Sequence, residues 1–375
     1  MKFSFVCHEF PPIGGGAASA LDQFTAALAL RGHRIQVITI GLGWKDTVVT
    51  EASNREIVRL GTGRRRVLAP SAPQLAASYL ALRHGAPAHL ERFSPQALVA
   101  FFAFPAGHAM RPAARRLGCP LIVSLRGSDV PGFSPARWGL LQTLMPLLVR
   151  PVLRQADRVL ANGAALGRMA EAFLPGLTWH NLPNGTDRKR FHPGSLDPLE
   201  TPLRTLFVGQ FIRRKRCLEW LDALHRLGQQ GIPIRATLVG DGPLYPEVRK
   251  KAAALPANIT VHLTGSLPRE QLPDIYRQHH VLLHLSTAEG VSNVLLEGMA
   301  SGLAVVASRP AVDPSMLPAV SVVDDPTPDN IALAVARLHA DRDLLVSRQR
   351  AALHLAPDWE ATVEAFLDQV SGLCS

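Results

Sequence analysis

Short runs of consecutive apolar residues alternate with stretches of helical spacing along nearly the whole chain. The runs predicted as strands are 3–7, 34–40, 97–102, 121–125, 158–161, 204–208, 235–239, 260–263, 281–285, 304–307 and 321–323. They are apolar throughout rather than alternating, which is typical of parallel strands covered on both faces. Helical spacing between them, as in 20–31, 218–229 and 294–300, predicts repeated strand–helix units and doubly wound α/β sheets.

The pattern breaks once, at 183–203, where four prolines and the pair Asn184-Gly185 interrupt it. Such punctuation favours a linker between domains. At 375 residues the chain is long enough for two domains, each with its own core. We therefore expect a first domain over 1–182, a linker over 183–203 and a second domain over 204–356. The last stretch, 359–373, has the spacing of an amphipathic helix.

Charge divides at the same place. The whole chain has a net charge of +10, and residues 1–180 hold 20 Lys and Arg against 9 Asp and Glu. The remaining residues hold 20 against 21, so the positive excess belongs to the first half. This imbalance indicates an anionic partner such as a phosphorylated ligand, a membrane surface or nucleic acid. With only 3 tyrosines and no stripe of mixed aromatic and basic residues, a single-stranded nucleic-acid surface is disfavoured.

The four cysteines are far apart and form no CxxC pair, which excludes a disulfide-rich fold and a cysteine zinc ribbon. The opening apolar run 3–7 is too short for a signal-peptide core, and no window of about 18 apolar residues is present. The nearest approach is 138–149, which contains Pro146. It fits a buried helix kinked at the proline, or a helix lying in a membrane interface.

Three loops that follow predicted strands carry candidate chemistry. The first holds Gly14-Gly15-Gly16 before a helix, where backbone N–H groups and the helix N-terminus suit a phosphate. It lacks the GxGxxG pattern of a dinucleotide site, and a simple tight turn is an equally good interpretation.

The second loop begins the sequence Glu289-Gly-Val-Ser-Asn-Val-Leu-Leu-Glu297, in which Ser292 or Asn293 is placed to cap the next helix. Two carboxylates beside a helix N-terminus suit sugar hydroxyls and a diphosphate. In isolation, two solvated acidic residues explain the pattern as well.

The third loop runs from Gly209-Gln210 to Arg213-Arg214-Lys215-Arg216, a concentration of positive charge able to neutralise a diphosphate. A solvated basic turn is the alternative. The strand before Gly240-Asp241 ends at the same predicted sheet edge, where ligands bind in open α/β folds.

Taken together, the motifs resemble glycosyltransferase family 4, the large retaining group with the GT-B fold. The resemblance covers nearly the whole chain: Pro11–Gly16, the passage 28–39, Asn184-Gly185-Thr186-Asp187, Gly240–Pro243, and the Glu289/Glu297 pair in their family order. It implies two Rossmann-like doubly wound domains that face a central cleft, with the C-terminal helix 357–375 joining the first domain.

The resemblance also implies roles for individual residues. Glu297 would hold the ribose of a nucleotide, Glu289 the hydroxyls of the donor sugar, and Lys215 with Arg214 the diphosphate. The glycines Gly15 and Gly16 would face the donor across the cleft. The donor-side set further includes Gln210, Gly240, Asp241, Ser292, Asn293 and Val294.

This sequence departs from the family pattern at two positions. The family often has Arg after the glycine of the basic loop, where this chain has Gln210. It commonly has His-Gly-x-Asp after a first-domain strand, where this chain has Arg126-Gly127-Ser128-Asp129. We place Arg126 and Asp129 on the acceptor side, and we expect Arg126, Lys215 and Glu289 to form the catalytic set. Arg126 is a candidate contact to the donor or to an anionic acceptor, but no general base, because a guanidinium stays protonated.

The implied activity is that of a retaining hexosyltransferase, which moves a sugar from a nucleotide sugar to a glycan or lipid-linked acceptor in polysaccharide or lipopolysaccharide assembly. No cofactor and no metal are expected, because Asp341-Arg342-Asp343 falls in a helical stretch and the histidines lack ligand spacing.

The resemblance implies a cytoplasmic protein. The basic first domain, with Arg64-Arg65-Arg66, Arg111, Arg115-Arg116 and Arg126, adds the hypothesis of peripheral attachment to an anionic membrane. A nucleotide-sugar epimerase of the same fold and a catalytically silent nucleotide-sugar-binding protein remain as alternatives.

Overall fold

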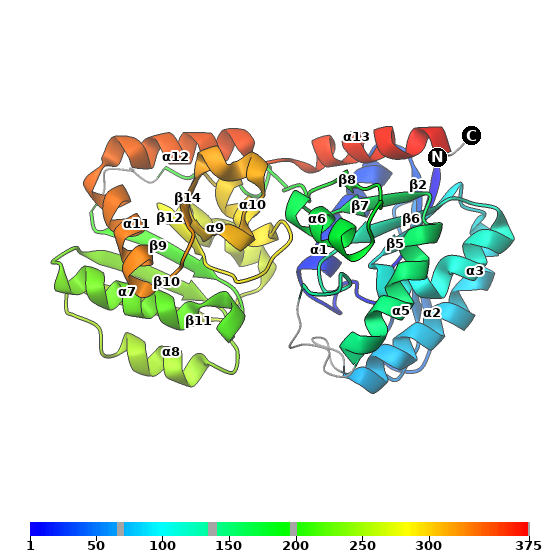
Figure 1. Cartoon of the computed structure of the whole chain (residues 1–375), viewed down its shortest axis with the longest axis horizontal. Helices are drawn as coiled ribbons and strands as arrows, with labels where there is room; N and C mark the ends of the chain where they lie inside the picture. Colours follow the sequence, from blue (N-terminus) through cyan, green and yellow to red (C-terminus); the bar gives the residue numbers. More distant parts are fainter. Residues whose placement is uncertain (66–70, 134–140, 196–200, 374–375) are drawn as a thin grey trace. The chain divides into compact units, whose positions relative to one another are not determined.

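The computed structural model describes residues 1–65, 71–133, 141–195 and 201–373. Contacts divide the chain into two units (Figure 1). Unit 1 comprises Met1–Gly185 and Trp359–Ser375, and unit 2 comprises Thr186–Asp358. Each unit is an α/β layer structure with its own sheet and its own core.

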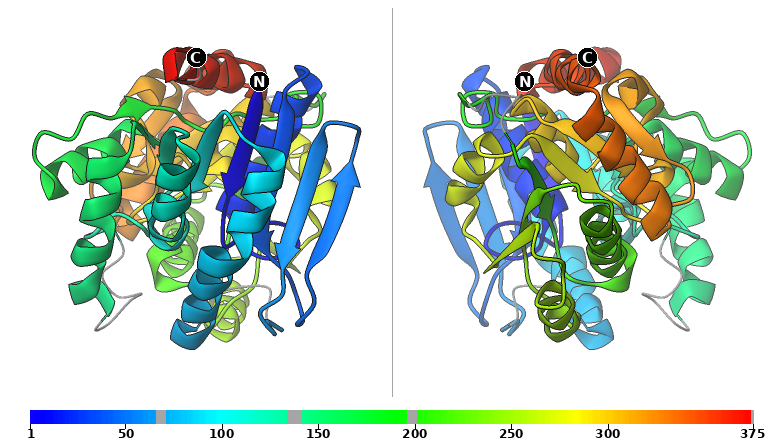
Figure 2. Two further views of the ribbon diagram at one scale, coloured as in Figure 1. Left: turned by 90° about the vertical axis from the view of Figure 1, so that its right-hand side faces the viewer. Right: turned by 90° about the vertical axis from the view of Figure 1, so that its left-hand side faces the viewer.

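Unit 1 contains an eight-stranded sheet of order β3-β4-β2-β1-β5-β6-β7-β8. Its strands are β1 (Lys2–Val6), β2 (Arg34–Ile40), β3 (Thr47–Glu51), β4 (Arg55–Leu60), β5 (Ala97–Phe101), β6 (Leu121–Leu125), β7 (Arg158–Ala161) and β8 (His180–Asn181). All neighbours are parallel except the edge strand β3, which pairs antiparallel with β4. This edge hairpin, visible in the left view of Figure 2, is absent from the sequence-based prediction.

Helices cover both faces of this sheet. Those of unit 1 are α1 (Gly16–Leu30), α2 (Ala72–Phe93), α3 (His108–Leu117), α5 (Leu141–Gln155), α6 (Ala164–Phe173) and α13 (Trp359–Val370). One apolar cluster packs α2, α3, α5 and α6 against the sheet. A second cluster packs α1 and α13 against the other face, where Phe366 contacts the rings of Phe3 and Phe24 at 5.5 and 5.2 Å.

Unit 2 contains a six-stranded parallel sheet of order β11-β10-β9-β12-β13-β14. The strands are β9 (Leu203–Val208), β10 (Ile234–Val239), β11 (Ile259–Gly265), β12 (Val281–His284), β13 (Ala304–Ser308) and β14 (Val320–Val323). Numbered from its own first strand, the order is 3-2-1-4-5-6, that of a doubly wound dinucleotide-type fold. The chain therefore reverses its winding direction between β9 and β12.

The helices of unit 2 are α7 (Cys217–Gln229), α8 (Tyr245–Ala252), α9 (Leu272–Arg277), α10 (Asn293–Ala300), α11 (Pro328–Ala340) and α12 (Arg342–Leu355). Apolar side chains of α7, α8 and α11 pack on one face of the sheet, and those of α9 and α10 pack on the other. The described part of the segment 183–203 is packed as well. Phe191 is buried against the ring of Tyr276, with centroids 5.7 Å apart, so the residues after Gly185 belong to unit 2.

Candidate active site

The main cluster of charged side chains in unit 2 lies where β9 and β12 run side by side. Parallel strands end at the same edge of the sheet, and the loops that follow β9 and β12 diverge there. In open α/β sheets this reversal of winding is the usual ligand position. The two loops are joined directly, because the Thr287 N–H donates to the Arg214 carbonyl oxygen at 3.0 Å.

Two cations of the first loop contact one carboxylate of the second. Arg214 Nη1 donates to Glu289 Oε1 at 2.8 Å and to the carbonyl oxygen of Ala288 at 2.6 Å, and Lys215 Nζ donates to the same Glu289 oxygen. Ser286 Oγ also donates to Glu289 Oε1, at 2.9 Å. The side chain of Lys215 is 14% exposed and that of Glu289 16% exposed, so the pair is largely shielded from water.

The neighbouring basic side chains keep the Glu289 carboxyl group ionised. Burial by itself raises the pKa of Glu289, but Lys215, His284 and Arg214 together lower that pKa to about 2. Glu289 is therefore ionised at any physiological pH, and its negative charge offsets the two cations while no other anion is bound.

His284 ends β12 beside this cluster and is a residue that the sequence analysis did not single out. It is buried, and burial followed by the nearby Lys215 lowers its pKa to about 3. Its Nε2 atom has no hydrogen-bond partner among the described residues. In the sequence, His284 is distinguished only as a histidine near the end of an otherwise apolar predicted strand.

Glu297 lies on α10, whose first turn follows the N-cap residue Ser292. The side chain of Ser292 makes no capping hydrogen bond. Glu297 is buried, and its two oxygens accept hydrogen bonds from Arg269 Nη2 at 2.7 Å and from the Tyr276 hydroxyl at 3.1 Å. Neither Arg269 nor Tyr276 belongs to the predicted site.

The absence of a side chain at Gly240 allows the loops of this edge to approach each other. A Cβ atom on Gly240, where φ is +145°, would lie 1.9 Å from the carbonyl oxygen of Gly209. Gly240 therefore tolerates no side chain without a shift of the backbone. The neighbouring Gln210 and Asp241 are exposed, and the Asp241 carbonyl oxygen accepts from the Phe211 N–H at 2.8 Å.

The glycine-rich loop of unit 1 follows β1. Gly14 has a φ of +101°, and a Cβ atom there would lie 2.7 Å from that of Glu9. Gly15 is the N-cap of α1 and Gly16 its first residue, and both are exposed. The loop thus presents the N-terminus of a 15-residue helix, as its sequence predicts.

Arg126 and Asp129 follow β6 in unit 1, and both are hydrogen-bonded to neighbouring residues of unit 1. Asp129 is buried and accepts backbone N–H groups from Ala103, Arg126 and Gly127 at 2.7, 3.0 and 2.9 Å. Burial raises the pKa of Asp129, and these three hydrogen bonds oppose the rise. Asp129 therefore organises the loop that carries Arg126.

The Arg126 guanidinium is held on three sides. It lies 3.7 Å from the centroid of the Phe101 ring and donates to Asn184 Oδ1 at 2.6 Å and to Ser124 Oγ at 2.7 Å. Burial lowers its pKa to about 9, so it remains charged at neutral pH. Arg126 and the buried Arg64 therefore do not belong to a free basic surface, which corrects that part of the membrane hypothesis.

The other arginines of that hypothesis differ in their surroundings. Arg111 donates to Gln155 Oε1 at 2.8 Å, and Arg116 pairs with Glu91 at 2.6 Å. Arg65 and Arg115 are exposed, and Arg66 lies outside the described residues. The predicted helix 138–149 begins in the undescribed stretch and continues as α5 through Pro146.

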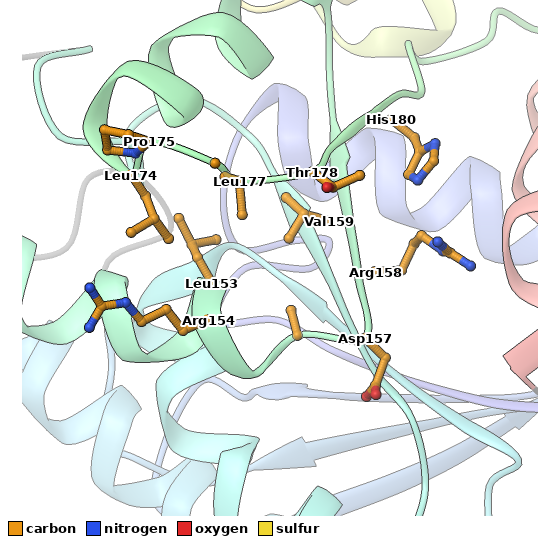
Figure 3. Close-up of a pocket in the computed structure, with 12 residues that line it drawn as sticks. Leu153, Arg154, Asp157, Arg158, Val159, Leu174, Pro175, Leu177, Thr178 and His180 are labelled. Carbon is orange, nitrogen blue, oxygen red and sulfur yellow. The ribbon is translucent and has the colours of Figure 1, made fainter.

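A pocket of about 330 Å³ lies in unit 1 at the amino ends of β7 and β8 (Figure 3). Its lining includes Arg154, Arg158, His180, Leu174 and Leu177. Figure 3 shows Arg158 and His180 on one side and the Arg154 side chain pointing away from them. None of the predicted site residues lines it, because they follow the opposite, carboxyl ends of the strands.

Within the part of the chain that the structure describes, no three His, Cys, Asp or Glu side chains gather in a way that could hold a metal ion. Asp341 is the N-cap of α12 and accepts from the Leu344 N–H at 2.9 Å, while Asp343 lies in the first turn of that helix.

No helix among the described residues has the length and hydrophobicity needed to cross a membrane.

Comparisons with known proteins agree with this architecture. Two family models match: "Glycosyltransferase Family 4" over residues 14–190 and "Glycosyl transferases group 1" over residues 189–353. The GDP-mannose-dependent alpha-mannosyltransferase of Mycobacterium tuberculosis is 28% identical over 321 residues, which is 82% of this chain and 79% of that protein. The GDP-mannose-dependent alpha-(1-6)-phosphatidylinositol dimannoside mannosyltransferase of the same species is 24% identical and covers 89% of this chain and 87% of that protein.

Among solved structures, the sucrose-phosphate synthase of Thermosynechococcus elongatus superimposes with a TM-score of 0.82 at 19% identity, over 100% of this chain and 99% of that one. The fold and the pair of matching models define a glycosyltransferase of the GT-B type. The chain belongs to glycosyltransferase family 4, and it is a retaining enzyme that uses a nucleotide sugar.

Proposed function

We propose that the enzyme transfers a sugar from a nucleotide-diphosphate donor to a hydroxyl of a glycan or lipid-linked acceptor in cell-surface polysaccharide or lipopolysaccharide assembly. The observation that carries the donor side is the joint contact of Arg214 and Lys215 with Glu289 at the edge where β9 and β12 end. A diphosphate that enters there competes with Glu289 for both cations, and Glu289 then becomes available to sugar hydroxyls.

In this proposal the protein stabilises charge and aligns the reactants. The bond between the anomeric carbon and the phosphate oxygen breaks, and negative charge develops on the diphosphate beside Lys215 and Arg214. The acceptor hydroxyl forms the new bond on the same face of the sugar, and its proton passes to the leaving phosphate. Glu289 orients the sugar and Glu297 the ribose, so binding energy is used to fix the reacting groups. No covalent nucleophile is assigned.

The names of the two mannosyltransferase relatives make GDP-mannose the first donor to test. A thermal-shift screen against GDP-, UDP-, ADP- and TDP-sugars is the experiment. A ligand at 100 times its dissociation constant stabilises the folded state by about 2.7 kcal/mol, and we expect one sugar nucleotide to do so. If none of the four classes shifts the transition, the proposed function is wrong.

Product analysis then separates transfer from epimerisation. With the stabilising donor and a glycan or glycolipid acceptor, the labelled sugar should appear on the acceptor with its anomeric configuration retained. An epimerase would release or invert the sugar without an acceptor, and a silent binding protein would return the donor unchanged.

For the acceptor side, we propose that α5 contacts an anionic membrane surface. Its outer face exposes Leu144 by 49% and Leu147 by 70%, and Arg150 and Arg154 on the same helix are also exposed. Exposed leucines beside arginines are typical of a helix at a lipid interface. The phosphatidylinositol-based acceptor in the name of one relative supports a lipid-linked acceptor here.

Sedimentation with phosphatidylglycerol-containing and with purely zwitterionic vesicles tests the membrane contact. Binding should require the anionic lipid and should weaken in Leu147→Glu, whereas Leu333→Glu, at a 50% exposed leucine of unit 2, serves as the matched control. Equal recovery with both kinds of vesicle, or no difference between the two variants, contradicts the α5 proposal but leaves the donor chemistry untouched.

A further inference from the structure

Glu297 has two neighbours to which the proposed function gives no task. The first is Arg269, in the single helical turn Arg269–Gln271 that precedes α9, and the second is Tyr276 on α9 itself. They contact different oxygens of the carboxylate, Arg269 at Oε1 and Tyr276 at Oε2. The carboxylate is therefore held from two sides by two elements.

The hydrogen-bonding capacity of the carboxylate explains why this arrangement suits a diol. An ionised carboxylate has about four acceptor positions, two on each oxygen. Arg269 and Tyr276 occupy one on each oxygen of Glu297, and one position on each oxygen remains. The two remaining positions are a fixed distance apart, which suits the adjacent 2′- and 3′-hydroxyls of a ribose.

The same two neighbours influence the charge of Glu297. Burial raises the pKa of Glu297, whereas Arg269, the Tyr276 hydroxyl and the more distant Arg190 lower it. Burial, followed by the neighbouring Glu297, raises the pKa of Tyr276 well above its ordinary value, so its hydroxyl stays protonated and can only donate to the carboxylate. Arg269 is the nearest compensating charge, and its side chain is still 29% exposed, at the border of the buried site.

We propose that Arg269 and Tyr276 are positioning residues of the nucleotide site, which hold the Glu297 carboxylate in one orientation and leave its two remaining acceptor positions for the vicinal hydroxyls of the ribose. This inference rests on the proposed function, because Glu297 binds a ribose only if the donor is a nucleotide sugar. Arg269 acts through Glu297 and needs no contact of its own with the donor.

Calorimetric titration of the full-length enzyme with GDP and with 2′-deoxy-GDP tests the inference. The wild type should bind GDP about tenfold more tightly than the deoxy form, because the deoxy form leaves one buried acceptor position unused. Arg269→Gln and Tyr276→Phe should each weaken GDP binding severalfold and reduce this ratio toward one. UDP and 2′-deoxy-UDP form a second matched pair of probes.

The control variant is Arg277→Gln. Arg277 lies on α9 one residue after Tyr276. It pairs with Asp274, donates to the Arg190 carbonyl oxygen at 3.2 Å, and has no contact with the Glu297 side chain among the described residues. The Arg277→Gln substitution removes one positive charge from the same region. It should leave both the affinity for GDP and the preference for GDP over 2′-deoxy-GDP unchanged. A loss equal to that of Arg269→Gln would show that net charge alone matters and would overturn the positioning role.

A pH series provides a second measurement. The groups that face the Glu297 carboxyl are Arg269, Tyr276 and Arg190. Nucleotide affinity should decrease as pH falls and Glu297 takes up a proton, and in Arg269→Gln this decrease should occur about one pH unit higher or more. In Glu297→Gln the ribose preference should be absent at every pH.

The outcomes distinguish a failure of the positioning role from a failure of the proposed function. If the wild type binds nucleotide but Arg269→Gln and Tyr276→Phe keep its ribose preference and pH profile, the inference is overturned and the proposed function stands. If the wild type binds neither nucleotide nor any sugar nucleotide, both fail. Because Tyr276→Phe preserves volume in a buried position, it remains informative even if Arg269→Gln lowers thermal stability.

Discussion

The charged clusters of the two units occupy corresponding places, after the carboxyl ends of parallel strands, yet they are built differently. In unit 2 the charges contact each other, with Arg214 and Lys215 on Glu289. In unit 1 the buried Asp129 accepts three backbone N–H groups, and Arg126 is held by neutral side chains and an aromatic ring. The first arrangement can exchange partners when an anion arrives, whereas the second fixes the shape of a loop.

Lys215→Ala should show the largest effect. Removal of a preorganised charge beside a leaving group typically costs about 10²–10³ in turnover, while the fold should persist because Arg214 still contacts Glu289. Initial rates with the donor identified by thermal shift, together with circular dichroism, provide the measurement. Turnover close to that of the wild type would exclude Lys215 from the active site and remove the contrast with unit 1.

Asp129→Ala should affect stability instead. Three backbone N–H groups would lose their acceptor in a buried position, at a cost of about 3 kcal/mol or more in the free energy of unfolding of unit 1. Differential scanning calorimetry should resolve the lowered transition. An unchanged melting temperature with lost activity would instead make Asp129 a direct participant in the reaction.

Arg126→Lys keeps the charge but loses the planar contact with Phe101 and the paired hydrogen bonds to Asn184 and Ser124. We expect a loss of about 1–2 kcal/mol. That corresponds to roughly 2–8 °C in melting temperature for a domain of this size. Turnover should fall by less than about tenfold, far less than in Lys215→Ala. A hundredfold loss of turnover at full stability would make Arg126 a substrate contact.

Acid titration should show a smaller effect, on the stability that the charged cluster of unit 2 provides. Because the pKa of Glu289 is about 2 in the folded chain, against 4.5 for a free glutamate, its contribution to stability is complete above pH 4.5 and is lost as pH falls toward 2. The free energy of unfolding should therefore decline more steeply over this range in the wild type than in Glu289→Gln. Parallel curves for the two proteins would mean that Glu289 has no net electrostatic stabilisation.

Chelation should have the smallest effect. Arg214 and Lys215 already supply positive charge at the proposed diphosphate position, so turnover in excess EDTA should equal that in buffer. A complete loss that added Mg²⁺ or Mn²⁺ restores would contradict this expectation.

Much of the fold could be predicted because buried parallel strands are continuously apolar. The strands 34–40, 121–125 and 158–161 were predicted with the bounds that the structure has. The hairpin β3–β4 was missed because β3 is exposed along its whole length and pairs antiparallel at an edge, so Thr47–Glu51 carries no buried pattern. The two-residue strand β8 is too short to produce any periodic signal.

The candidate site was predicted less completely. The sequence marks the basic and the acidic loops, and the resemblance to family 4 singles out Glu289, Glu297 and Lys215 within them. The first and last of these contact each other. Neither identified Arg269 or Tyr276, which reach Glu297 from the turn before α9 and from α9 itself, or His284, which ends an otherwise apolar strand. The role of Asp129 could not be inferred either, since its partners are backbone N–H groups that only the folded loop brings together.

The helix α13 completes unit 1 from the far end of the chain. Its Phe366 packs against Phe3 and Phe24, and its Trp359 donates to Gln23 at 3.2 Å. During synthesis, the first 185 residues therefore leave the ribosome long before the helix that covers one face of their sheet. Unit 2 is one uninterrupted segment and can fold before α13 is available, whereas the aromatic side chains Phe3 and Phe24 stay without their α13 partner until that helix has been synthesised.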